Sequence, residues 1–301
     1  MRKLFKYFVI PVGLMTFIKV LFIGSVVSTL FMKCECERDT IVDPVSPKGS
    51  INFVFDHYIN DASAVFDQMT YWNAAGNNWE LAEVQWFISD VTLHKLNGDS
   101  VMLNNWSFYH YIDTDIPSSL EWDIVDKVDT ATYDHISFTF GIKGEKNEPF
   151  MFVNPPENQM FWPYHLGGDE GGYHYLKMNG FWQDTNSFRR GFNFHLGVGQ
   201  KQYSNGTRMK VWDPSILPNG DSSYVFVQNW FEVKLPASSF TLGENKTKQI
   251  EIIMNLENWL STPNPFDFNK WGADIMENNA AMQLVKENGQ NVFSVGEIKD
   301  L

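Results

Sequence analysis

Hydrophobic and polar residues alternate along several short stretches of the chain. Residues 50–57 place Ile51, Phe53 and Phe55 on one face, and residues 133–141 repeat the pattern. Alternation with a period of two predicts half-buried β-strands. The other stretches of this kind are 83–96, interrupted near residues 89–90, and 173–180, 192–198, 224–235 and 249–256. The turn sequence Asn97-Gly98-Asp99 predicts a hairpin after the strand over residues 83–96.

These patterns predict one all-β domain over residues 49–301, with a β-sandwich-like or barrel-like fold. Glycine, asparagine and proline separate the short strands, as is typical of such folds. Aromatic residues make up 16% of the chain, which favours sheet over helix and provides enough apolar area for a large core. Residues 274–287, rich in Met, Ala and Leu, predict a C-terminal helix that ends at Asn288-Gly289.

The first 33 residues have the composition of a signal or anchor segment. Basic residues at the start precede an apolar stretch that approaches the length needed to span a bilayer. Cys34 follows as a candidate lipid attachment site, and residues 34–48 form a polar tether. The bulky residues before Cys34 leave an uncleaved transmembrane anchor open, and Cys34 with Cys36 is also a weak candidate pair of metal ligands. Either anchor predicts a bacterial cell envelope protein, on its periplasmic or surface face, tethered through its N-terminus only.

The charge and the histidines narrow the class of function. The formal net charge is −13, and the sequence lacks the basic footprint that nucleic acid binding needs.

Residues 158–199 hold three of the seven histidines together with two glycine pairs and two tryptophans. If the strands that carry His174 and His195 are neighbours, both imidazoles point into one site, and imidazole suits copper and zinc alike. His94 and His135, flanked by polar turns, are interpreted as structural residues, and His57 as intermediate between a structural and a functional residue. No nucleophile elbow, phosphate loop or metalloprotease helix indicates an enzyme.

Five sequence blocks together resemble a known family. They are INFVFDH, EVQWFISDVTLHKLNG, YDHISFTFGI, MFWP followed by GGYHYLKMNG, and FNFHLGVGQ. In this order they resemble the MbnP-like copper-binding family, named for a periplasmic partner encoded beside methanobactin clusters, over residues 49–301. The chain looks like the Bacteroidetes-type lipoprotein branch of that family.

The resemblance implies a β-rich exported fold with a copper site built from histidines. It also implies, as in relatives, a tryptophan that a partner haem enzyme oxidises to kynurenine. Carried over block by block, it indicates His195 as the first copper ligand and His174 as the second. His110 is a third candidate imidazole. Trp162 is the candidate for the oxidisable or site-adjacent tryptophan.

We therefore expect copper capture or handover in the envelope, without turnover. Two imidazoles and a weak third ligand in a water-poor pocket favour Cu(I), and binding should weaken as the pH falls towards about 6 because ligation needs neutral histidine. The alternative is a metal-free binding or adhesion module for carbohydrate or protein, which predicts exposed aromatic rows and histidines that do not converge. An enzyme would instead show a deep pocket of carboxylates with perturbed pKa values.

Overall fold

The computed structural model describes residues 46–103, 107–166, 171–199, 201–203 and 224–301, which belong to one compact unit. The predicted signal or anchor segment, Cys34 and the tether as far as residue 45 lie outside the described residues. Within the described part of the chain, none of the helices has both the length and the hydropathy that crossing a membrane requires.

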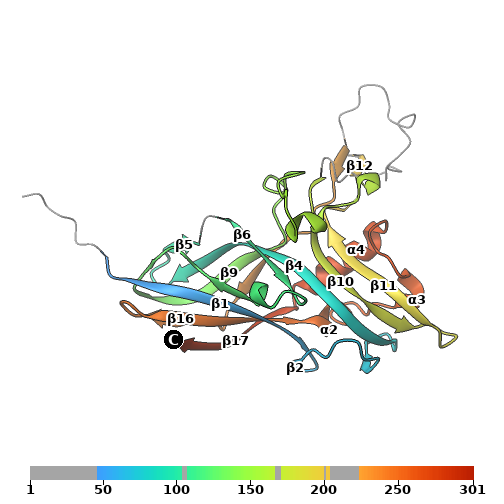
Figure 1. Ribbon diagram of the computed structural model, residues 1–301, viewed down its shortest axis with the longest axis horizontal. Coiled ribbons are helices and arrows are strands. Elements are labelled where there is room, and N and C mark those ends of the chain that lie inside the picture. The colour runs from blue at the N-terminus through green and yellow to red at the C-terminus, as the bar shows by residue number, and fades with distance from the viewer. Residues whose placement is uncertain (1–45, 104–106, 167–170, 200, 204–223) are drawn as a thin grey trace, which may run out of the picture. The chain divides into compact units, whose positions relative to one another are not determined.

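The first of two sheets has six strands and is built around a parallel pair (Figure 1). Its central order is β17-β16-β1-β2, and β7 and β8 also pair with β1. The strands are β1 (Lys48–Ile59), β2 (Ala62–Ser63), β7 (Glu121–Asp123), β8 (Val128–Asp129), β16 (Thr247–Asn255) and β17 (Phe293–Asp300). Strand β1 runs parallel to β16, although nearly 200 residues of chain separate the two.

The second sheet has nine strands in the central order β11-β10-β4-β9-β14. Strands β3, β5 and β6 pair with β4, and β15 pairs with β9. The strands are β3 (Tyr71–Trp72), β4 (Asn78–Lys95), β5 (Ser100–Met102), β6 (Tyr109–Asp113), β9 (Ala131–Phe140), β10 (His174–Gln183), β11 (Arg189–Gly197), β14 (Phe231–Leu235) and β15 (Phe240–Leu242). A separate two-stranded ladder joins β12 (Lys201–Tyr203) to β13 (Tyr224–Phe226).

The two sheets pack face to face through aromatic side chains. Phe55 of β1 lies 5.7 Å from Trp86 of β4, and Phe293 of β17 lies 5.3 Å from the same indole, between ring centroids. Phe293 also meets Phe138 of β9 edge to face at 5.1 Å. Phe55, Trp86 and Phe138 are almost entirely buried and come from alternating stretches of the sequence, while Phe293 is half-buried between them. The prediction of an all-β sandwich-like fold is confirmed.

The α-helices of the described residues lie in the C-terminal part of the chain. Helix α4 (Asn279–Gly289) overlaps the predicted helix but begins later, where the Asn278 side chain accepts a hydrogen bond from the Ala281 N–H. Helices α2 (Leu256–Trp259) and α3 (Phe268–Trp271) are short, as are the 3₁₀ helices η1 (Pro117–Leu120), η2 (Glu157–Met160) and η3 (Tyr164–Leu166). The chain continues past α4 into β17, so the predicted C-terminal helix is not the last element.

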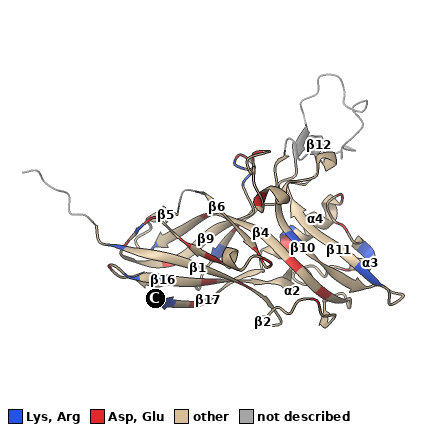
Figure 2. Cartoon of the chain, viewed as in Figure 1, with Lys and Arg blue, Asp and Glu red and all other residues tan. Residues whose placement is uncertain are grey.

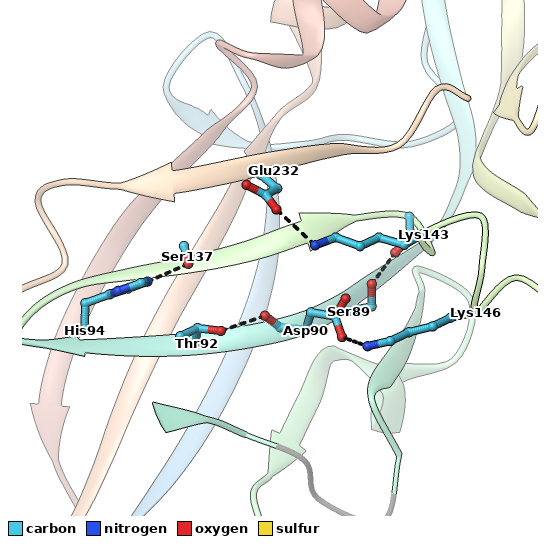
Figure 3. A network of polar contacts seen from close by, with 9 residues as sticks. Ser89, Asp90, Thr92, His94, Ser137, Lys143, Lys146 and Glu232 are labelled. Carbon is cyan, nitrogen blue, oxygen red and sulfur yellow. Dashed lines mark hydrogen bonds and ion pairs between the residues drawn. The ribbon is translucent and has the colours of Figure 1, made fainter. Parts of the chain in front are cut away.

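The interruption predicted in the long second stretch is a bulge in β4. The register against β9 shifts between Ser89 and Thr92, and Asp90 has a φ of +52°. Lys146 forms an ion pair with the buried Asp90 carboxylate, and the Thr92 hydroxyl donates to the Asp90 carbonyl (Figure 3). Elsewhere on the described strands, basic and acidic side chains are interspersed (Figure 2).

Candidate functional site

His174 and His195 meet at the end of the β10–β11 hairpin that lies away from its turn. In the ladder, His174 is opposite Gly197 and His195 is opposite Lys177. Regular alternation would place His174 with Leu176 on the opposite face from His195. A register shift between His174 and Leu176 breaks the alternation, and β-bulges of this kind re-aim side chains. As a result, the two imidazole rings lie 5.2 Å apart between centroids, at 88° to each other.

Each imidazole uses one ring nitrogen for the protein and leaves the other bare. His174 Nδ1 lies 2.8 Å from the Met160 carbonyl oxygen, so this nitrogen carries the proton and donates it. His195 Nε2 lies 2.7 Å from the Asn179 Oδ1 atom. His174 Nε2 and His195 Nδ1 are both buried, and neither has a hydrogen-bond partner among the described residues. Buried polar atoms are rarely left unpaired, and an unpaired one indicates a binding site, strain or another function.

Trp162 forms one wall beside this pair. The backbone N–H of Trp162 donates to the Gly172 carbonyl at 2.9 Å, which sets the segment around Trp162 alongside the start of β10. The indole is fully buried, and its ring centroid lies 4.6 Å from that of His174. Gly197 makes this position possible, because a Cβ atom there would lie only 2.3 Å from Trp162 Cζ3. The indole Nε1 also lacks a partner among the described residues.

The surroundings of the pair keep both histidines neutral. Burial, with a contribution from the charge of Lys177, lowers the pKa of His195 to about 3. Burial, then His195, then Lys177 lower the pKa of His174 well below its usual value. Protonation costs more here because a charge would have to be buried without a counter-ion. These shifts move the onset of proton competition from about pH 6, where unperturbed histidine titrates, to a lower pH.

Three acidic side chains gather beside Asn179, whose amide donates to Glu83 at 2.8 Å. Glu83, Asp113 and Asp115 bring carboxylate oxygens within 4.8 Å of one another. Donors already meet two of them: the Gln85 amide contacts Glu83 and Asp113 at 2.8 and 3.1 Å, and the Tyr111 hydroxyl contacts Asp113 at 2.7 Å. The arrangement is therefore a hydrogen-bonded network beside the histidine pair.

Comparison with known proteins assigns the chain to a family. Residues 48–280, well over half of the chain, match the family model described as MbnP. The chain belongs to the MbnP family. The solved structure of MbnP from Methylosinus trichosporium is similar over 83% of this chain and 98% of that one, with a TM-score of 0.49 and 12% sequence identity. The comparison with curated proteins finds no match.

In this MbnP family member, His110 lies apart from the pair. It belongs to β6, where its ring stacks between Phe55, at 5.5 Å, and Trp122, at 4.9 Å. Its Nε2 atom bonds the Ser119 carbonyl oxygen at 2.8 Å. No ring contact or hydrogen bond joins His110 to His174 or His195 within the described ranges. The structure therefore brings together three of the four predicted site residues of the body and leaves His110 in a different place.

The other histidines of this MbnP family chain have structural partners. His57 Nε2 accepts the Trp86 indole N–H at 3.0 Å, and burial lowers the His57 pKa to about 4. His94 and His135 lie opposite each other on β4 and β9, with their rings stacked at 4.2 Å. The His94 ring bonds the Ser137 hydroxyl, which Figure 3 shows on the neighbouring strand.

Two residues of the site were missed from the sequence. Lys177 and Asn179 lie at alternate positions of β10, on the face that looks towards His195, because Lys177 is opposite His195 in the ladder. The signal was the polar alternation in YHYLKMNG, where the intervening residues Leu176 and Met178 are fully buried. An alternating strand carries its polar set on one face, and that set indicated where the site lies.

Proposed function

We propose that this protein binds one copper ion, as Cu(I), between His174 Nε2 and His195 Nδ1, for capture or handover in the cell envelope without turnover. The observation that carries the proposal is the pair of neighbouring imidazole rings, each of which has one buried nitrogen without a partner among the described residues. Neutral imidazole is the protonation state that a metal needs, and the lowered pKa values of both rings maintain it. The family assignment supports the same reading.

The burial of the two rings favours a monovalent ion. The Born cost of burying an ion rises with the square of its charge, so a dication is much harder to bury here than Cu(I). The Lys177 ammonium has the Glu83 and Asp113 carboxylates beside it, so the preference rests on burial and not on the sign of the nearby charges. Trp162 excludes water from one side, and its fully buried ring leaves the ion in an apolar setting. Oxidation of Trp162 by a haem enzyme stays a prediction of the family resemblance, which intact-mass measurement of the native protein would test.

The test is a Cu(I) titration of the full-length protein, purified without chelators, against a chromophoric competitor. We expect one Cu(I) per chain. We expect His174→Ala and His195→Ala to lose more than about 100-fold in affinity, beyond what loss of an outer-shell partner costs. His94→Ala is the control, since His94 is also a strand histidine but is half-buried and belongs to another part of the sheet. Wild-type protein without stoichiometric copper, or histidine variants that bind as tightly as the control, would contradict the proposal.

A metal-free binding module remains the second candidate function because of one exposed aromatic cluster. Phe150 and Tyr164 are both more than half exposed, and their ring centroids lie 6.3 Å apart. They border a recess of about 390 Å³ that Phe161 and Tyr173 also line. Clustered exposed rings are typical of interaction sites. This alternative predicted histidines that do not converge, whereas His174 and His195 do, so copper binding comes first.

A further inference from the structure

Asn179 and Glu83 form a short hydrogen-bonded relay that ends on His195. Asn179 lies opposite Glu83 in the β10–β4 ladder. Its amide Nδ2 donates to Glu83 Oε2 at 2.8 Å, while its Oδ1 atom faces His195 Nε2 at 2.7 Å. Glu83 is in turn held through its other oxygen by the Gln85 amide, at 2.8 Å.

The carboxylate decides which way the Asn179 amide points. An ionised carboxylate only accepts hydrogen bonds, so the end of the amide that faces Glu83 must be the NH₂ group. The carbonyl oxygen of Asn179 must then face His195. An amide oxygen also only accepts, so His195 Nε2 must carry the proton and Nδ1 must carry the lone pair. The ionised Glu83 carboxylate therefore determines the orientation of the Asn179 amide, and that orientation determines which nitrogen of His195 carries the proton.

We propose that Asn179 and Glu83 are positioning residues, which lock His195 as the Nε2–H tautomer and so present the bare Nδ1 atom to the ion. His174 is locked in the opposite tautomer, because its Nδ1 atom faces the Met160 carbonyl and must donate. The pair is therefore preorganised with one lone pair on each ring before any metal arrives. Outer-shell partners of this kind fix ring orientation and tautomer in metal sites generally. The role in copper binding rests on the proposed function, while the tautomer itself does not.

The experiment reads the tautomers of the metal-free protein by ¹⁵N NMR of the imidazole nitrogens at neutral pH, where both rings are uncharged. We expect Nε2–H for His195 and Nδ1–H for His174 in the wild type. Glu83→Gln keeps the size of the side chain but offers a donor as well as an acceptor, so the Asn179 amide can turn. His195 should then populate the Nδ1–H form, and Asn179→Leu, which removes the acceptor at similar size, should do the same. Asn179→Asp must share one proton with Glu83, because two carboxylates in contact cannot both ionise, but its other oxygen still accepts from His195, so it should keep Nε2–H.

His174 serves as the internal control, because its tautomer should be unchanged in all three variants. For Cu(I) affinity we expect a loss of about 10–100-fold in Glu83→Gln and Asn179→Leu, and a smaller loss in Asn179→Asp. If His195 is Nδ1–H in the wild type, or keeps Nε2–H in both Glu83→Gln and Asn179→Leu, the inference is overturned. Absence of copper binding by wild-type protein overturns the proposed function alone, since the tautomer measurement needs no metal.

Discussion

Gly197→Ala tests whether the Trp162 indole is seated on the β11 backbone beside the histidine pair. The added methyl carbon would lie 2.3 Å from Trp162 Cζ3 and 2.4 Å from Cε3. Non-bonded carbons rest at about 3.5–4.0 Å, so the indole or the strand must move by more than about 1 Å. Because the indole is fully buried, no open space absorbs this movement.

We expect a net loss of about 1–2 kcal/mol in the free energy of unfolding. Overpacking a core costs about 1–3 kcal/mol, and the smaller conformational entropy of alanine in the unfolded chain returns about 0.4–1 kcal/mol. The matched control is Gly191→Ala on the same strand, where the nearest atom to the added carbon, in Phe181, would be 3.6 Å away. This control should be neutral or slightly more stable than wild type.

The assay is urea denaturation of both variants, with Cu(I) affinity measured in parallel. Since Trp162 contacts the His174 ring, Gly197→Ala should weaken copper binding and Gly191→Ala should not. Equal stability of the two variants, at equal denaturant dependence, would refute the reasoning, because it would mean that no buried ring stands over Gly197.

Three further outcomes follow from the histidine environments. Trp86→Phe leaves the buried His57 Nε2 atom without its donor and should cost about 1–3 kcal/mol more in urea denaturation than Trp79→Phe, whose indole N–H has no partner in the described structure. Because the folded pKa values of His57 and His195, about 4 and about 3, lie below the unfolded value of 6.5, the unfolded state binds more protons and stability should fall below pH 6.5. Between pH 6.5 and its folded pKa, each histidine lowers the free energy of unfolding by about 1.4 kcal/mol per pH unit. A free energy of unfolding that stays constant between pH 6.5 and 5 would contradict these shifts. His110→Ala should leave Cu(I) affinity unchanged, and a loss above about tenfold would place His110 in the site.

The strands could be predicted wherever one face is buried and the other is not. Residues 50–57 show this well, because every second side chain of β1 is buried against the other sheet. Strand β17 was missed because its residues are mostly half-buried, so its sequence shows no clean alternation. Two-residue strands such as β2 and β3 are too short to show a period at all. Their pairing is decided by the strands beside them.

The sequence could predict that the strands of His174 and His195 are neighbours, because a hairpin is a local structure. It could not predict that the two side chains share a face. Alternation groups His174 with Leu176, and only the bulge turns the imidazole towards His195. The bulge lies directly after the residues that pair with the segment around Trp162, a contact that strand periodicity does not predict. Glu83 lies 96 positions from Asn179, so no spacing rule indicates their contact.

The bare imidazole nitrogens predict that the proposed copper binding and folding are linked. An unsatisfied buried polar group costs about 1–3 kcal/mol, and the metal-free protein carries one on each of two neighbouring rings. A ligand that accepts both lone pairs binds the folded state and not the separated histidines of the unfolded chain. At a free Cu(I) concentration of about 100 times Kd, the free energy of unfolding should rise by about 2.7 kcal/mol, visible as a higher melting temperature. His195→Ala should abolish that rise while removing one of the unpaired nitrogens. A rise of equal size in wild type and His195→Ala would mean that copper stabilises the protein from a site elsewhere.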